Sequence, residues 1–162
     1  MRPIVAARLR ASFANASVRE RKLIPLPDLD AIDWDRIDFL GWRDQRQPLV
    51  GYVVSYVDDE PVGLLMKQTE ARPRQRTQCS WCADVHLPND VVMFGTRRAG
   101  AAGRRGDTIG TLVCGQFECN ANVRKLMPPP YLGFDAEAAR ESRIAALRAN
   151  VEGFIRDAVS GS

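Results

Sequence analysis

The sequence predicts an α+β fold, an antiparallel β-sheet with short helices before it and one long helix after it. Two pairs of strand-like segments, rich in β-branched and apolar residues, lie in the middle of the chain, and turn-forming residues interrupt each pair. Apolar residues at helical spacing occur near the two ends of the chain instead. Four cysteines in two close pairs flank the second pair of strands.

The length and composition fit one domain. The 162 residues have a mass of 18.0 kDa, and 45% of them are apolar, which is ordinary for a globular protein. The stretch from Met1 to Ala11 holds apolar runs too short for a signal peptide, so we expect a cytoplasmic protein. The net charge of +3 is too small to indicate nucleic-acid binding, so only the placement of charge is informative.

The N-terminal part predicts two short helices. Apolar residues recur at helical spacing over residues 4–13. Residues 17–20 read Ser-Val-Arg-Glu, the form of a capping box, in which the Ser and Glu side chains satisfy free amides of a helix start. The prolines at positions 25 and 27 end this helical part.

The following segment, residues 28–44, combines aspartates with aromatic residues. We expect its aromatic side chains to cover a core while its carboxylates face water. The residues concerned are the aromatic Trp34, Phe39 and Trp42 and the acidic Asp28, Asp30, Asp33, Asp35, Asp38 and Asp44.

Two hairpins are predicted after this segment. The first joins residues 51–57 to 62–67 through Asp58-Asp59-Glu60-Pro61, which has the composition of a turn. The second joins residues 90–96 to 108–113. Its connection, residues 97–107, is long and basic for a simple turn and holds three glycines.

Two further helices complete the prediction. A short one starts after Cys119 and runs to about Leu126, before a run of three prolines. Asp135 can cap a long helix that runs to about Val159. Its apolar stripe, which should dock on the sheet, consists of Ile144, Leu147, Val151, Phe154 and Ala158.

The four cysteines have the spacing of a zinc site. Two residues separate Cys79 from Cys82, four separate Cys114 from Cys119, and 31 lie between the pairs. A spacing of two residues lets a tight knuckle aim two thiolates at one point, and tetrahedral zinc takes two such pairs at about 2.3 Å. The first pair leads into a hairpin and the second lies where a strand passes into a helix, an arrangement called a treble clef. We therefore predict one structural zinc ion bound by all four thiolates.

Other interpretations of these residues are disfavoured. A redox Cys-x-x-Cys pair normally precedes a helix, whereas residues 83–90 contain Pro88 and turn formers. A zinc deaminase needs a His-x-Glu element, which the sequence lacks. His86, the only histidine, could replace Cys119 as the fourth ligand, although a histidine so placed is more often a donor to a thiolate or a loop residue. Four thiolates would close the zinc coordination, which argues against catalysis by the metal.

Arginines gather before the first cysteine pair and in the connection of the second hairpin. If both segments border the zinc, they would form a patch for an acidic partner or for phosphate, whereas ordinary solvated loops are the alternative. The glycines of the second segment suggest a loop that needs positive φ or a close backbone approach. The first group is Arg72, Arg74 and Arg76, and the second is Arg97, Arg98, Arg104 and Arg105.

The chain shows no convincing catalytic set. The aspartates of residues 28–44 could pair for acid and base work, but neither a nucleophile motif nor a phosphate-binding loop accompanies them. We therefore expect a protein that is not an enzyme, with neither a membrane nor a small-molecule substrate as its partner.

Several of these motifs together resemble the treble-clef zinc-finger domain of elongation-factor-G-binding proteins, the FBP or FusB-type family. They are Cys79-x-x-Cys82, the run from Phe94 through Arg97-Arg98-Ala99-Gly100 to Cys114, Cys119, Val123-Arg124 and the upstream Phe39-Leu-Gly-Trp42-Arg-Asp. The resemblance spans most of the chain. It implies one domain over residues 1–162, with a helical extension at 1–27, the sheet and zinc finger at 28–126 and a C-terminal helix at 135–159.

The resemblance implies a non-enzymatic protein that binds translation elongation factor G and, in the resistance members, helps it to leave a ribosome stalled by fusidic acid. The four cysteines fall on the family's metal positions, and Arg97, Arg98, Arg104 and Arg105 fall in its basic loop. From their charge we expect these arginines to contact the partner. The FusB-type resistance proteins carry a longer N-terminal helical bundle than the two short helices expected here. An RNA- or ribosome-binding zinc module is the alternative, in which the same arginines would contact phosphate.

Overall fold

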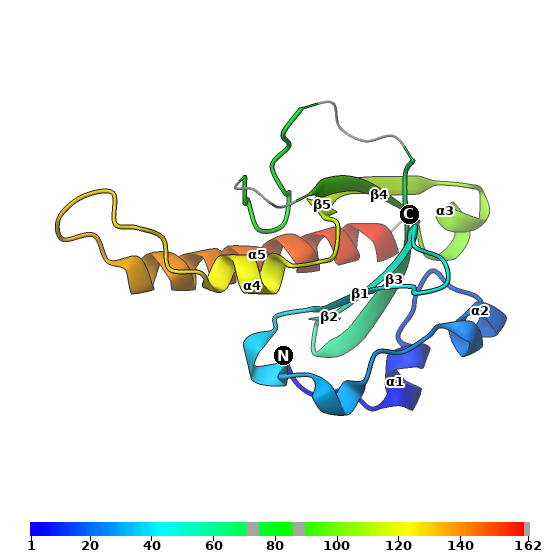
Figure 1. Ribbon diagram of the computed structural model, residues 1–162. Helices are drawn as coiled ribbons and strands as arrows, with labels where there is room; N and C mark the ends of the chain where they lie inside the picture. The colour runs from blue at the N-terminus through cyan, green and yellow to red at the C-terminus, as the bar shows by residue number, and fades with distance from the viewer. Residues whose placement is uncertain (71–74, 86–89, 161–162) are drawn as a thin grey trace.

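The computed structural model describes residues 1–70, 75–85 and 90–160 (Figure 1). Helices and strands follow one another in the order α1 (Ala6–Ala11), α2 (Val18–Leu23), β1 (Leu40–Arg43), β2 (Val50–Val57), β3 (Glu60–Gln68), β4 (Val91–Arg97), α3 (Gly100–Arg104), β5 (Thr108–Cys114), α4 (Cys119–Arg124) and α5 (Ala136–Val159). Two short 3-10 turns, η1 (Leu29–Ala31) and η2 (Trp34–Arg36), lie between α2 and β1. The capping box of α2 is confirmed, since Ser17 Oγ accepts from Glu20 N and Glu20 accepts from Ser17 N.

The five strands form one antiparallel sheet in the order β1-β2-β3-β4-β5, which confirms the α+β fold class. Strands β2 and β3 pair along almost their whole length, whereas β3 and β4 pair only at Lys67↔Gly95 and Gln68↔Phe94. The sheet therefore consists of two parts joined at a short seam. Figure 1 shows α5 between these two parts, with α1 and α2 on the far side of β1–β3.

The first hairpin has a tighter turn than the sequence predicts. Asp58 and Asp59 have φ values of 48° and 65°, as the two central residues of a type I′ turn require, so Glu60 and Pro61 already belong to β3. The Asp58 carboxylate receives both Arg156 Nη1 and Nη2 at 2.6 and 2.9 Å. This ion pair ties the hairpin turn to α5.

The segment at residues 28–44 contains β1, a strand that the sequence analysis missed. Its Phe39 is buried as expected, with only 1% of its surface exposed. The expectation that all carboxylates of this segment face water is wrong for Asp38 and Asp44, which are 8% and 5% exposed. Charged groups are buried in this way only where partners replace the lost water.

Asp44 finds such partners in the loop after β1. Its carboxylate accepts hydrogen bonds from the backbone N–H groups of Arg46 and Gln47 at 2.8 and 3.0 Å and from Tyr52 Oη at 2.9 Å. Burial opposes ionisation of Asp44, but these hydrogen bonds outweigh it, so that the pKa of the carboxyl group lies below its ordinary value. Burial and the hydrogen bond to the Asp44 carboxylate raise the pKa of Tyr52.

The basic connection of the second hairpin is a helical turn, α3, rather than the loop that the sequence predicts. A Cβ atom on Gly103 would lie 1.8 Å from the Arg98 carbonyl oxygen, so only glycine fits there. Gly100 begins the turn with φ of 66°, and Gly106 follows it with φ of 97°. The expected need for close approach and positive φ is thus confirmed.

The C-terminal helix begins and ends where predicted. Asp135 caps it by accepting a hydrogen bond from Ala138 N at 2.9 Å, and the helix ends at Val159. Its fully buried face consists of Leu147, Val151, Ile155 and Ala158, whereas Ile144 and Phe154 are half-buried. Within the described residues, no helix is long and apolar enough to cross a membrane.

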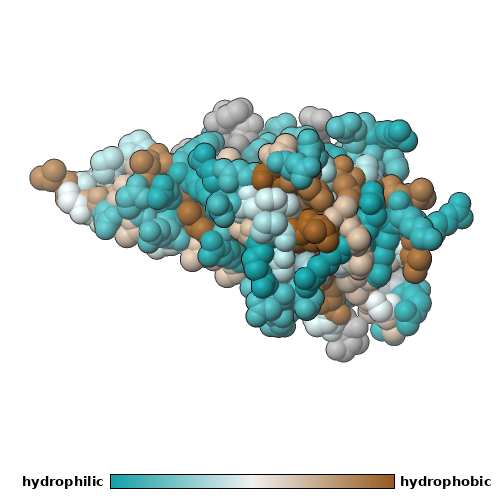
Figure 2. All heavy atoms as spheres, turned by 90° about the horizontal axis from the view of Figure 1, so that it is seen from below, coloured by the Kyte–Doolittle hydropathy of each residue, from teal (hydrophilic) through white to brown (hydrophobic). Residues whose placement is uncertain are grey.

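Two apolar clusters fill the molecule. One contains the cysteines and side chains of β2–β5 and α5. The other joins α1 and the residues on either side of α2, Ala16 and Ile24, to β1 and β2. Outside them, the loop between α4 and α5 projects from one end (Figure 1), and that end is apolar at its tip (Figure 2). Tyr131 and Leu132 in this loop are 65% and 103% exposed.

Candidate metal centre

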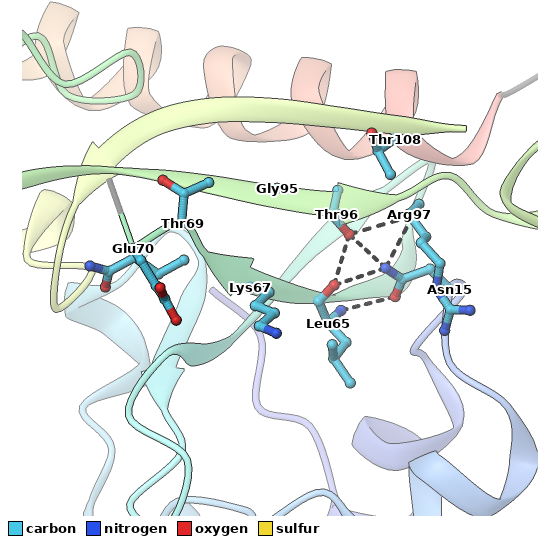
Figure 3. A pocket seen from close by; sticks show the side chains of 10 residues that line it. Asn15, Leu65, Lys67, Thr69, Glu70, Gly95, Thr96, Arg97 and Thr108 are labelled. Carbon is cyan, nitrogen blue, oxygen red and sulfur yellow. Dashed lines mark hydrogen bonds between the residues drawn. The ribbon is translucent and has the colours of Figure 1, made fainter. Parts of the chain in front are cut away.

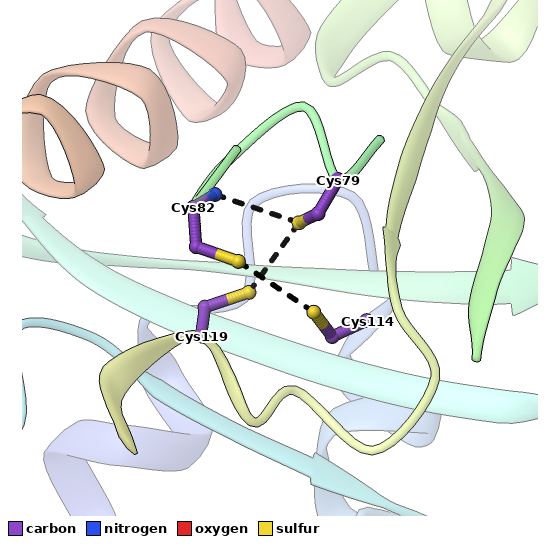
Figure 4. Close-up of side chains that lie close together, drawn as sticks. All are labelled: Cys79, Cys82, Cys114 and Cys119. Carbon is purple, nitrogen blue, oxygen red and sulfur yellow. Dashed lines mark hydrogen bonds between the residues drawn. The ribbon is translucent and has the colours of Figure 1, made fainter. Parts of the chain in front are cut away.

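The four cysteines converge from three segments of the chain (Figure 4). Cys79 and Cys82 lie in the knuckle before β4, Cys114 ends β5, and Cys119 is the first residue of α4. All four are buried and free of disulfides, and their Sγ atoms lie within 4.8 Å of one another.

The sulfur positions fit a tetrahedral zinc ion. The Sγ atoms of Cys79 and Cys119 are 3.6 Å apart, and so are those of Cys82 and Cys114. Ligands at about 2.3 Å from zinc in a tetrahedron lie roughly 3.8 Å from one another. The cluster therefore suits one structural zinc ion with a closed set of four thiolates.

Backbone contacts shape the knuckle around the site. Cys82 N points to Cys79 Sγ at 3.5 Å, and Ala83, with φ of 57°, donates its N–H to Cys79 O at 2.9 Å. Ser80 N donates to Leu112 O at 2.7 Å, which fastens the knuckle to the edge of β5. The turn after β5 passes through Phe117 at φ of 59°, and this turn brings Cys119 back toward Cys114.

The four sulfurs differ in how readily they form the thiolate that zinc needs. Hydrogen bonds from the thiol groups of Cys114, Cys119 and Cys82 lower the pKa of Cys79 far below that of an ordinary thiol. The contacts with Cys114, Cys79 and Cys82 raise the pKa of Cys119 instead. Zinc binds thiolates, so its binding must release the protons that such sulfurs keep.

Asn122 is a functional residue that the sequence analysis missed. Its Nδ2 lies 3.5 Å from Cys114 Sγ and 3.9 Å from Cys82 Sγ, and its Oδ1 accepts from Lys125 Nζ at 3.0 Å. An amide donor beside two sulfurs offsets the excess negative charge of four thiolates on one Zn²⁺. Asn122 follows Cys119 by three residues on α4, so both side chains lie on the same helix face. This spacing is the sequence pattern from which a contact of Asn122 with the cysteines could have been predicted.

The knuckle is fixed to the core through Trp81, which is 2% exposed. Its ring meets Phe39 edge-on at 5.3 Å, stacks on Phe117 at 6.2 Å and contacts Phe154 at 5.8 Å. Asn150 Nδ2 on α5 donates to Trp81 O at 3.0 Å. The metal site is thereby locked to both the sheet and α5.

A buried carboxylate joins α4 and α5 beside the metal site. The Asp38 side chain, only 1% exposed, forms an ion pair with Arg124 on α4 at 2.8 Å and a second one with Arg148 on α5. The neighbouring Asn120 accepts from Asp38 N and donates to Phe39 O, both at 2.8 Å. The segment that was expected to be a solvated acidic face thus contributes a structural ion-pair network.

The four predicted arginines in and around α3 lie at the other end of the hairpin from the cysteines. Strands β4 and β5 pair Val91 with Cys114 at one end and Arg97 with Thr108 at the other. Six residues of extended strand span roughly 20 Å. The condition that this group of arginines borders the zinc is therefore not met, because the length of the hairpin separates them.

Contacts with α5 and with the N-terminal part hold α3 instead. Ala99 N donates to Ala158 O at 2.9 Å, and Arg98 pairs with Asp157 at 3.1 Å. Arg97 pairs with Glu20 of the α2 capping box at 3.5 Å. The α3 end of the hairpin is thus fixed by the two ends of the chain.

The predicted arginines differ in how far their side chains are exposed. Arg97 and Arg105 are 57% and 62% exposed, whereas Arg98 is only 26% exposed. Arg104 is exposed and makes no ion pair among the described residues.

The arginines before the knuckle are described only in part. Arg76 is exposed and donates to Val85 O at 2.7 Å. Arg72, Arg74 and His86 lie outside the described residues.

Comparison with known proteins is consistent with this geometry. A family model described as the FBP C-terminal treble-clef zinc-finger matches residues 8–158. Among solved structures, that of the fusidic acid resistance protein FusC is similar, with a TM-score of 0.50 and 24% identity over 65% of this chain and 47% of that one. The chain thus spans about half the length of that protein, and the likeness shows a shared fold. No curated protein sequence matches. The family match and the cysteine cluster together confirm the predicted treble-clef zinc finger.

Proposed function

The chain belongs to the FBP C-terminal treble-clef zinc-finger family, and from this premise we propose that it is a non-enzymatic cytoplasmic protein that binds translation elongation factor G. We also propose that residues 1–162 act as one domain, because both apolar clusters share the same sheet. The similar fold of a protein named for fusidic acid resistance supports a role near the translating ribosome.

The observation that carries the proposal is the exposed arginine turn at the end of the β4–β5 hairpin. This arginine turn consists of Arg97 at the end of β4, Arg104 in α3 and Arg105 directly after it, and all three side chains are exposed to solvent. Contacts with α5 and the N-terminal part hold the turn in place. Guanidinium groups bind carboxylates through paired hydrogen bonds, which suits an acidic partner. Arg98 has a different role, since its contact with Asp157 anchors the turn.

The metal centre supports a binding role rather than catalysis. Four cysteine thiolates fill the tetrahedral positions of zinc and leave none for water or a substrate. In this proposal zinc stabilises the sheet and α4, and the arginine turn makes the contact.

Co-purification from cell extract with elongation factor G, combined with zinc analysis, tests partner and metal together. Arg104→Glu should abolish co-purification, because it reverses a charge at the centre of the arginine turn. Arg36→Glu is the matched control, since Arg36 is also exposed and also makes no ion pair among the described residues. Equal capture by both variants would refute the proposed contact surface.

Binding to RNA or to the ribosome is the second candidate, because the same exposed guanidinium groups also suit phosphate. It predicts RNA affinity that falls steeply with salt in the absence of the factor.

Promotion of factor release from a stalled ribosome is a further step of the first proposal, binding to elongation factor G. It can be measured as turnover of the factor on ribosomes in the presence of fusidic acid.

A further inference from the structure

A cavity of about 610 Å³ lies at the seam where β3 and β4 meet (Figure 3). Its wall includes Lys67 and Thr69 from the β3 side, Gly95 and Arg97 from β4, and Thr108 from β5. None of these residues touches the metal centre. The volume lies in the range of sites for small ligands.

Asn15 forms one end of the cavity by holding β3 and β4 apart. Its Nδ2 donates to Leu65 O at 2.9 Å and to Thr96 Oγ1 at 2.6 Å, and its Oδ1 accepts from Leu65 N at 2.9 Å. These bonds satisfy backbone groups of β3 that a longer β3–β4 ladder would have paired. The two strands can therefore part here without leaving polar groups unsatisfied, because Asn15 and Thr96, whose Oγ1 donates to Leu65 O at 2.7 Å, bridge them at this end of the cavity.

Gly95 lies on the floor of this cavity, and neither backbone conformation nor packing requires a glycine there. Its φ is not positive, and a Cβ atom would meet only Lys67 O, at 4.0 Å. Gly63 is different, because a Cβ there would lie 3.0 to 3.2 Å from Ser12, Val54 and Phe13. A glycine inside a strand weakens it and often marks the close approach of a ligand. The free space above Gly95 therefore points to something that occupies the cavity.

The charges of the cavity are separated along its length. Figure 3 shows Arg97 and Asn15 at one end, Thr69 and Glu70 at the other, and Lys67 between them. Lys67 is exposed and makes no ion pair within the described part of the chain, and Arg97 has only the 3.5 Å contact with Glu20. Lys67 pairs with Gly95, and Arg97 follows two residues later, so the two cations are diagonal neighbours roughly 7–8 Å apart at their backbones. Two cations at this spacing can both reach a single phosphate group.

We propose that this cavity binds a phosphate-bearing ligand of nucleotide size. Its phosphate lies at Lys67 and Arg97, its flat body covers Gly95, and its hydrogen-bond donors face Thr69 and Glu70. The site shares Arg97 with the proposed partner surface but does not depend on binding of elongation factor G. Lys67 and Gly95 are separate from the arginine turn, so variants at these two positions test the cavity alone.

The first experiment is a titration of the zinc-loaded protein with AMP, followed through backbone amide signals in NMR. Saturable shifts are expected at Lys67, Gly95 and Arg97. Adenosine, which lacks the phosphate, should bind at least about tenfold more weakly. Inorganic phosphate should also bind more weakly, because it leaves the floor at Gly95 uncovered.

Variants make the test specific. Lys67→Ala and Gly95→Val should each weaken AMP binding by about tenfold or more, the first by loss of charge and the second by filling the floor. Gly95→Val should leave the melting temperature unchanged or raised, because valine favours strands and the Cβ position is open. Gly153→Ala on α5 is the control, since a Cβ atom there would meet nothing within 4 Å and Gly153 lies outside the cavity. It should leave AMP binding unchanged.

Two results would overturn the proposal. One is the absence of saturable shifts at the seam with AMP, or equal affinity for AMP and inorganic phosphate. The other is AMP binding by a folded Gly95→Val variant as tight as that of the unaltered protein. Neither result bears on the binding of elongation factor G.

Discussion

The two ends of the β4–β5 hairpin are stabilised by different kinds of contact. At the cysteine end, four buried sulfurs, the Trp81 ring and the Asp38 ion pairs join the knuckle, α4 and α5. At the α3 end, hydrogen bonds to the backbone of α5 and from Asn15, together with two partly exposed ion pairs, hold the turn against α5 and the N-terminal part. The first end is part of the core, whereas the second is a surface attached to it.

This difference separates stability from recognition. A metal centre of closed coordination can hold strands together without contacting a partner, whereas exposed arginines can contact a partner only where they remain solvated. Removing contacts at the cysteine end should therefore unfold the protein. Removing contacts at the α3 end should loosen one turn.

The largest effect is expected from loss of a metal ligand. Cys114→Ser should abolish zinc binding and cost at least about 5 kcal/mol of stability, because binding of a structural zinc ion contributes directly to folding. Zinc content and the thermal unfolding transition measure the effect, and a strong chelator should reproduce it. Ser80→Ala, an exposed position in the same knuckle, is the control and should keep both zinc and stability.

The next largest effect is expected at Asp38. Asp38→Ala should cost about 3–5 kcal/mol, because it leaves the guanidinium groups of Arg124 and Arg148 without their buried partner. Urea denaturation measures this loss. Asp58→Asn removes the charge of an exposed ion pair with Arg156 and tolerates the positive φ of this position, so it should cost clearly less. Equal losses would contradict the importance of burial.

A smaller effect is expected at Asn122, and it should appear in metal affinity. Asn122→Ala should weaken zinc binding by about 10 to 100-fold, because it removes the amide donor beside Cys114 and Cys82. Competition with a chromophoric chelator measures the affinity. Asn120→Ala is the control: it should lower stability through β1 and leave zinc affinity unchanged.

The smallest effect is expected at the α3 end. Asp157→Asn should cost under about 1 kcal/mol, because the ion pair with Arg98 is partly solvated. Amide hydrogen exchange should become faster in α3 while protection at β5 near Cys114 stays the same. Faster exchange at the cysteine end as well would show that the two ends are coupled.

Local patterns in the sequence predicted most elements of the fold. The Asp135 cap and the apolar spacing after it placed α5 correctly, and the cysteine spacing indicated the zinc site. Strand β1 was missed because it is short, and because Gly41 and Arg43 interrupt its apolar pattern. The apolar stripe of α5 was predicted correctly except that Ile155 is fully buried, whereas Phe154, which was expected there, is half-buried. The spacing of apolar residues defines the buried face of a helix only to within about one residue.

The contacts between distant segments could not be predicted in this way. Nothing near Asn15 in the sequence indicates that its side chain separates β3 from β4, because its partners lie 50 and 81 residues away. The burial of Asp38 likewise depends on Arg124 and Arg148, which belong to other elements.

The sequence by itself therefore determined the chemistry of this protein: a four-cysteine zinc site, an arginine-rich connection and the helices and strands that carry them. These properties depend on spacing over a few residues, where chain geometry leaves few alternatives. Only the tertiary structure decided that the zinc and the arginines lie at opposite ends of one hairpin and that a cavity opens beside Gly95. Those positions depend on strand register and on burial shared by segments far apart in the chain, which no local pattern encodes.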